Sequence, residues 1–163
     1  MKIKDRIIEL KRVKAKELSP HPSNWRKHPQ KQQDAMRGAL AEIGYADALK
    51  VRQHNGGYQI IDGHLRAETT PDMEVPVLVL DLDDTETKKM LATFDPLAGL
   101  AEIDDEMLKS LSNDIDFDNE DLKDLADELT VLSLNADGQE FTAAVADDVA
   151  MTQCPECGHE FPK

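Results

Sequence analysis

Five consecutive residues, Asp62-Gly63-His64-Leu65-Arg66, combine side-chain types that bind or transfer phosphate. They follow a strand-like run and precede a segment compatible with a helix. A strand-to-helix turn presents unpaired backbone N–H groups and the positive end of the helix dipole, and both favour anions. Gly63 lets a ligand approach the backbone, and Arg66 can grip a phosphate with two parallel hydrogen bonds. His64 is the candidate for proton transfer near neutral pH.

The same residues also have a purely structural interpretation. Asp62 is able to cap the helix, Gly63 to ease the turn, and Arg66 to pair with Glu68 or another surface acid. Gly-x-x-Arg is a short pattern with little specificity. The spacing alone therefore leaves both interpretations open.

A second polar cluster precedes this turn in the segment SPHPSNWRKHP. Its three prolines predict an irregular loop. The loop holds Asn24, and its Trp25 is able to stack a base while Arg26 holds a phosphate. The alternative for Trp25 is to fill the edge of the core beneath the loop. A phosphate at the turn needs a second cation, which favours a binding role for Arg26.

Hydrophobic periodicity and turn signals predict the elements that position these residues. A helix is predicted over residues 30–43, where apolar residues recur at a spacing of three and four. A tight hairpin is predicted at Asn55-Gly56, between strands within residues 48–53 and 58–62. For the residues before the first loop, the sequence does not decide between a strand and a helical turn.

The elements after the turn alternate between helix and strand. They are a helix over residues 64–69, a buried strand over 75–82, a helix over 85–94 capped by Asp83 or Asp84, a break over 95–101 and two short acidic amphipathic helices.

Charge divides the chain of 163 residues into two unlike parts. The first 70 residues carry a net charge of +6 and the remainder carries −20, which gives −14 in total. A basic part can neutralise phosphates, whereas an acidic block repels nucleic acid and serves as a solvated surface or an interaction arm. The predicted organisation is a domain over residues 1–101, an acidic helical arm over 102–132, a linker over 133–152 and a tail over 153–163.

The tail contains the only two cysteines, in the sequence CPECGHEF. Cys154 and Cys157 have the spacing of a zinc knuckle, and His159 is a third candidate ligand. Zinc takes four ligands, so a closed site needs a further donor from this chain, a second copy or a partner. A knuckle without metal and a redox Cys-x-x-Cys are the alternatives.

The segments LSPHPSNWRKHPQKQQDAMRGALAEIGYADALKV, YQIIDGHLRAETT and VPVLVLDL together resemble the amino-terminal domain of the ParB and sulfiredoxin superfamily. The resemblance spans about residues 7–101. It implies an α+β fold, a small mixed sheet with packed helices, whose Gly-x-x-Arg turn binds nucleotide phosphates. Members of the superfamily use it in CTP hydrolysis for DNA partition, free-serine phosphorylation, nuclease activity or sulfinic-acid repair.

The resemblance also implies roles for single residues. Gly63 and Arg66 match the phosphate turn, and Asn24 and Arg26 match the polar residues of the first loop that face it. Asp95 lies where the superfamily has a polar residue that closes over the nucleotide, which implies a role in placing Mg²⁺. The alternative for Asp95 is a turn residue ahead of a proline.

Other positions depart from the family pattern. Partition proteins have Glu and a second Arg where this chain has His64 and Leu65, which argues against metal-assisted CTP hydrolysis. Sulfiredoxins have a nucleophilic Cys at the position of His64, so sulfinic-acid repair is excluded. DGHLR is closer to the DGHTR type of the serine-kinase branch and to ParB-like proteins of phages and mobile elements. The helix-turn-helix of partition proteins is replaced by an acidic region, so we do not expect this chain alone to read DNA.

The sequence thus predicts a nucleotide- or phosphate-binding protein in DNA maintenance or processing of a phage or mobile element. The ligand would be a nucleoside di- or triphosphate with Mg²⁺, and His64 would be catalytic in any hydrolysis or phosphotransfer. The predicted binding residues are Asn24, Arg26, Asp62, Gly63, His64, Arg66 and Asp95. The alternatives are a non-catalytic acidic adaptor or nucleic-acid mimic that binds a basic partner, and a ParB-like nuclease.

The cellular setting follows from what the sequence lacks. The amino terminus has charges at every second or third position, and no stretch approaches about 18 apolar residues. We expect a cytoplasmic protein of a bacterium or phage-infected host, without membrane contact. The expected partners besides the nucleotide are a DNA-processing protein and a second copy of the chain.

Overall fold

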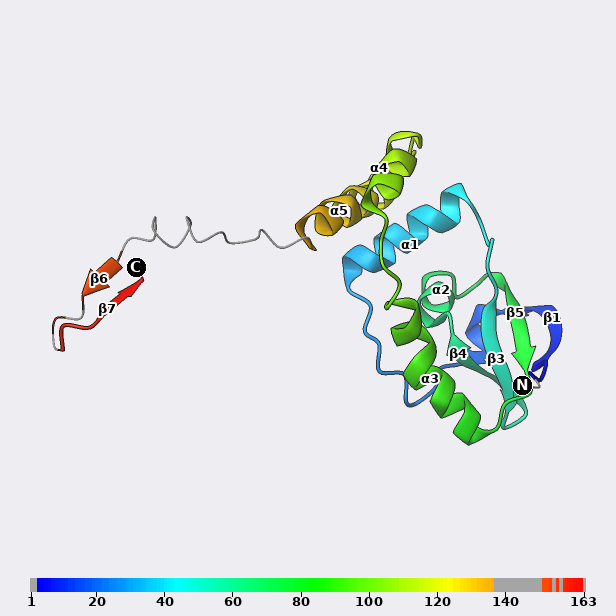
Figure 1. Cartoon of the computed structure of the whole chain (residues 1–163). Coiled ribbons are helices and arrows are strands. Elements are labelled where there is room, and N and C mark those ends of the chain that lie inside the picture. Colours follow the sequence, from blue (N-terminus) through cyan, green and yellow to red (C-terminus); the bar gives the residue numbers. More distant parts are fainter. Residues whose placement is uncertain (1–2, 137–150, 154, 156, 163) are drawn as a thin grey trace.

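The protein is described by a computed structural model that covers residues 3–136, 151–153, 155 and 157–162. A five-stranded mixed sheet forms its centre (Figure 1). The strands are β1 (Ile7–Lys14), β2 (Leu18–Ser19), β3 (Leu49–His54), β4 (Gly57–Asp62), β5 (Glu74–Leu80), β6 (Met151–Gln153) and β7 (Glu160–Pro162). The helices are α1 (Gln30–Glu42), α2 (His64–Thr69), α3 (Asp84–Ala98), α4 (Asp105–Asn113) and α5 (Glu120–Ala136), and a single 3₁₀ turn, η1 (Ala15–Glu17), joins β1 to β2.

The strand order of the sheet is β1-β5-β3-β4-β2. The pairs β1/β5 and β3/β4 are antiparallel, whereas β5/β3 and β4/β2 are parallel. This arrangement confirms the predicted α+β class with a mixed sheet and packed helices. It also resolves the open segment before the first loop, which forms β1, η1 and β2.

Apolar residues fill both faces of the sheet. On one face, Val75, Val77 and Val79 of β5 pack with Leu49 and Val51 of β3, and all five are fully buried. On the other face, residues of β4, β5 and α3 form a smaller cluster of Ile61, Leu80 and Met90. A strand buried on both faces needs a continuous apolar run, which explains the sequence VPVLVL.

The hairpin between β3 and β4 is confirmed. Asn55 and Gly56 have φ values of 51° and 79°, which place both central residues in the left-handed region. A type I′ turn requires this conformation, and its twist matches that of the flanking strands.

Helix α3 begins as predicted but continues further than predicted. Asp83 and Glu86 form a reciprocal capping box at its amino end. The predicted break at Asp95 is wrong, because the helix continues through Pro96 to Ala98. Pro96 lies in the last turn, where its missing N–H removes one hydrogen bond without interrupting the turns before it.

The acidic helices pack on the domain. Helix α5 contacts α1, and α4 packs against α5, so α1 lies between α2 and the acidic pair (Figure 1). Lys31 of α1 forms an ion pair with Glu128 at 2.6 Å, and the backbone N–H of Asn119 donates to the carboxylate of Glu42. A Cβ on Gly38 would lie 2.3 Å from Asn119 Oδ1, so glycine lets α1 approach the start of α5 closely.

The tail forms a two-stranded antiparallel hairpin, β6 with β7. Cys157 and His159 are exposed in its loop, and Cys154 lies outside the described residues. No group of three metal-binding side chains occurs within residues 3–136 and the described part of the tail. The zinc prediction therefore stays a prediction.

None of the helices in the described ranges is both long enough and apolar enough to cross a membrane.

Candidate functional site

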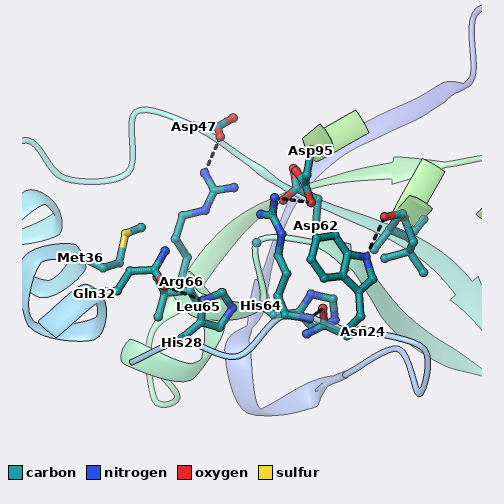
Figure 2. A pocket seen from close by; sticks show the side chains of 15 residues that line it. Asn24, His28, Gln32, Met36, Asp47, Asp62, His64, Leu65, Arg66 and Asp95 are labelled. Atoms are coloured by element: carbon teal, nitrogen blue, oxygen red, sulfur yellow. Dashed lines mark hydrogen bonds and ion pairs between the residues drawn. The ribbon is translucent and has the colours of Figure 1, made fainter. Parts of the chain in front are cut away.

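A cavity of about 380 Å³ lies beside Gly63, where the first loop, α1, α2 and α3 meet. All seven residues predicted to bind the ligand line it. They come from segments far apart in the sequence, and Figure 2 shows several of their polar ends facing one another. The lining residues are Asn24, Trp25, Arg26, His28, Gln32, Met36, Asp47, Ile61, Asp62, Gly63, His64, Leu65, Arg66, Leu91 and Asp95.

Gly63 joins β4 to α2 in a conformation that other residues rarely adopt. Its φ is 94°, and a Cβ at this position would lie 2.7 Å from Cγ of Leu49 in the core. The same Cβ would lie 3.2 Å from Nη2 of Arg66. Glycine is therefore required both by the backbone and by the close approach of two side chains.

Arg66 folds back from the first turn of α2 toward Gly63, as the sequence predicts. Its guanidinium forms an ion pair with Asp47, which lies on the segment between α1 and β3 (Figure 2). The Arg66 side chain is only 15% exposed, whereas that of Asp47 is 67% exposed. Hydrogen bonding to Arg66 lowers the pKa of Asp47, and the charged pair is stable at neutral pH. Arg66 thus lines the cavity with a carboxylate already bound.

Arg26 is paired in the same way. Its Nη2 lies 3.0 Å from a carboxylate oxygen of Asp95 on α3. Its guanidinium also lies 5.5 Å from the centre of the Trp25 ring, a stacking distance. Trp25 is exposed rather than buried in the core, and its indole N–H donates to the Leu91 carbonyl at 3.2 Å. The indole is therefore held at the rim of the cavity.

His64 is buried at the floor of the site. Its Nε2 accepts a hydrogen bond from the backbone N–H of His21 at 3.3 Å, which puts its ring proton on Nδ1. Burial lowers the pKa of His64 to about 4, although the nearby Asp62 opposes this shift. The side chain is a neutral imidazole at pH 7, and its catalytic role stays a prediction.

Charges in the cavity balance one another. Asp62 is bound by Lys50 at 2.5 Å, in addition to the two arginine pairs already described. Asp62 and Asp95 carry oxygen ligands of the kind that Mg²⁺ accepts, which fits a nucleotide-bound cation. Glu68 does not line the cavity, and no cluster of three metal-binding side chains is found among the described residues.

Sequence reasoning did not find Asp47, Gln32 and Met36 as lining residues. Gln32 and Met36 are four residues apart and so lie on one face of α1, but periodicity alone does not say which element that face meets. Asp47 stands in a connecting segment with no motif. It reaches Arg66 only because β3 pairs beside β4.

The architecture matches a solved structure of a partition protein. It matches C-terminally truncated ParB from Caulobacter crescentus complexed with CTP-gamma-S, with a TM-score of 0.53 and 20% identity. The match covers 63% of this chain and 60% of the ParB chain. The chain has the ParB-like fold. The fold predicted from sequence is thereby confirmed.

Two other solved structures match with lower TM-scores. Sulfiredoxin from Arabidopsis thaliana matches 51% of this chain and 97% of its own, at a TM-score of 0.43 and 13% identity. C. crescentus ParB complexed to the centromeric parS site matches 77% of this chain and 68% of its own, at a TM-score of 0.46 and 17% identity. No protein-family model and no curated protein matches this ParB-like chain in sequence.

Proposed function

We propose that this ParB-like chain binds a nucleotide, or another phosphorylated small molecule, in the cavity beside Gly63. The observation that carries this proposal is the convergence of Arg26 and Arg66 on one cavity of about 380 Å³. A volume of this size accommodates a nucleotide-sized ligand. The broader setting, DNA maintenance or processing in a phage or mobile element, belongs to the same proposal.

Binding would proceed by exchange of anions. Each arginine holds one carboxylate, so a phosphate would replace Asp47 on Arg66 and Asp95 on Arg26. A phosphate offers more negative charge than a carboxylate and matches the guanidinium with two parallel hydrogen bonds. Asp47 is mostly exposed, so its release into water costs little.

The remaining groups would orient the ligand. The exposed Trp25 ring offers a stacking surface, while Asn24 and the backbone at Gly63 offer hydrogen bonds. The ParB structure with CTP-gamma-S supports a nucleotide as the ligand class. It does not select the base, because likeness at 20% identity concerns the fold.

A chemical step, if the chain catalyses one, would be nucleotide hydrolysis or phosphotransfer. His64 lines the cavity, and its Nδ1 is the nitrogen that carries the proton. Mg²⁺ bound with the nucleotide would offset phosphate charge near Asp62 and Asp95. We expect His64→Ala to lower turnover more than affinity and Arg66→Ala to lower both.

Isothermal titration calorimetry with ATP, ADP, CTP and GTP, each with Mg²⁺, tests the proposal on the full chain. We expect one nucleotide to bind, and Arg66→Ala to weaken it at least about tenfold by removing a charge-assisted contact. Arg37→Ala is the matched control, because Arg37 pairs with Asp34 on α1 and does not line the cavity. Absence of binding by all four nucleotides to the folded chain would contradict the nucleotide as the ligand.

A second candidate function is the acidic adaptor or nucleic-acid mimic. Two observations favour it: residues 71–163 carry a net charge of −20, and Met107 and Leu111 are exposed four residues apart on α4. A basic, partly apolar partner would complement this surface. Truncation after Leu100 should abolish capture of such a partner and leave nucleotide binding unchanged.

A further inference from the structure

Strand β1 lies at an open edge of the sheet and carries exposed apolar residues. It pairs with β5 on one side, and no described strand pairs with its other side. Ile7, Ile8 and Leu10 are 53%, 59% and 65% exposed. An edge of eight residues with unpaired backbone groups is a template for another strand, particularly where its side chains are apolar.

The hydrogen-bond pattern shows which backbone groups point outward. The N–H of Ala15 donates to the carbonyl of Met73, and the register continues with Val13 opposite Val75. In an antiparallel pair the hydrogen-bonded positions alternate, so odd-numbered residues from Glu9 bond to β5. Leu10 and Arg12 therefore direct their N–H and C=O groups to the free side.

Side-chain charges select one register for pairing with a second copy of β1. In an antiparallel pair centred on Leu10, Glu9 of each copy lies opposite Lys11 of the other. Shifting the centre to Glu9 or to Lys11 would place like charges directly opposite, which destabilises a strand pair. Glu9 and Lys11 lie on the same face of β1, with Oε1 and Nζ 3.4 Å apart. The Lys11 ammonium also donates to the Tyr58 hydroxyl of β4 at 2.7 Å, which fixes its position and leaves further N–H groups for the Glu9 carboxylate of a second copy.

Apolar contact supports the same register. The two Leu10 residues would lie directly opposite each other on the face that also bears Leu78, the β5 partner of Leu10. Ile8 lies at a bulge between Ile7 and Glu9, so the regular pairing with a second copy runs from Glu9 onward. Leu10, the most exposed apolar side chain of β1, would then be covered by its own counterpart.

We propose that this edge is a self-association surface, at which two copies pair β1 with β1 in antiparallel orientation about a two-fold axis through Leu10. The result is a continuous sheet of two five-stranded halves. A two-fold interface uses the same patch on both copies, and the order Glu9-Leu10-Lys11 is complementary to itself under this operation. The surface is separate from the cavity, because no residue of β1 lines it.

Sedimentation velocity over a concentration series tests this surface with the full chain. We expect a mass that rises to two chains at micromolar concentrations, since a strand-pair interface of small area is of moderate affinity. Leu10→Lys places two like charges at the two-fold axis and should leave a single chain. Leu100→Lys is the matched control: Leu100 is 76% exposed and lies outside the sheet, so the dimer should persist.

A charge exchange provides the sharper test. Glu9→Lys alone and Lys11→Glu alone each place like charges opposite and should weaken the dimer by about tenfold. The double variant Glu9→Lys/Lys11→Glu restores opposite charges and should recover the wild-type dimer affinity. A monomeric wild type, a dimer that survives Leu10→Lys, or single variants that dimerise as well as the double variant would each overturn the proposal.

Discussion

At the scale of single residues, burial controls the chemistry of the site. His64 is buried beneath the cavity and its Nε2 is occupied by the N–H of His21. Its pKa falls to about 4, so proton transfer at pH 7 would start from the neutral ring. The two arginines that line the cavity are each paired with a carboxylate, Arg26 with Asp95 and Arg66 with Asp47. With His64 neutral at pH 7 and its Nε2 already hydrogen-bonded, the geometry of the site fits ligand binding better than acid–base catalysis.

Replacement of His64 by Gln should flatten the pH dependence of stability. Folding holds His64 neutral while the unfolded chain takes up a proton near the ordinary pKa of 6.5, so its contribution is present above pH 6.5 and is lost as the pH falls toward about 4. The full loss is about 3 kcal/mol in the free energy of unfolding. Gln keeps an acceptor for the N–H of His21 and does not titrate. Urea unfolding at several pH values between 7 and 4 measures the difference, and equal slopes in both proteins would contradict it.

At the scale of elements, the junction of β4 and α2 positions the site. Gly63 turns the chain with a φ of 94°, and Leu49 of β3 packs directly against it. This contact couples the turn at Gly63 to the core. A ligand-binding residue on α2 can be placed precisely only if its preceding glycine is fixed against the sheet.

Gly63→Ala should destabilise the fold more than Gly56→Ala. Both glycines have positive φ, so both variants lose about 1 kcal/mol from backbone strain. Only at Gly63 does the new Cβ meet the core, at 2.7 Å from Cγ of Leu49, whereas nothing lies within 4 Å of it at Gly56. We expect an additional cost of about 1–3 kcal/mol at Gly63, the range for overpacking. Thermal unfolding followed by circular dichroism compares the two, and equal losses would show that the junction relaxes.

Local patterns predicted most of the elements but not their meeting points. The turn at Asn55-Gly56, the helix over residues 30–43 and the turn at Gly63 follow from signals within a few residues. The extension of α3 through Pro96 was missed because proline is a strong breaker only inside a helix, and its distance from the helix end is not visible in the sequence. Asp47 was missed because ion pairs between distant segments depend on strand order.

At the scale of the whole molecule, the acidic helices belong to the folded body. Helix α5 packs on the face of α1 that carries Lys31 and Gly38, while Gln32 and Met36 of the same helix line the cavity. The acidic segment was predicted from charge as an arm, because net charge does not show which helices pack together. Helix α1 is thus the element shared by the cavity and the acidic pair.

Truncation after Leu100 should lower stability without removing the cavity. It deletes α4 and α5 and exposes the packed face of α1, so we expect a loss of a few kcal/mol in the free energy of unfolding. Every residue that lines the cavity precedes Leu100, so a bound nucleotide should add the same increment to the free energy of unfolding of both chains and shift the Tm of both upward. Glu128→Gln is the control, since it removes only the exposed ion pair with Lys31 and should change stability by less than about 1 kcal/mol. If the truncated chain unfolded at the same temperature as the full chain, α5 would not stabilise α1; if it alone lost the nucleotide-dependent shift, the acidic pair would be part of the binding unit.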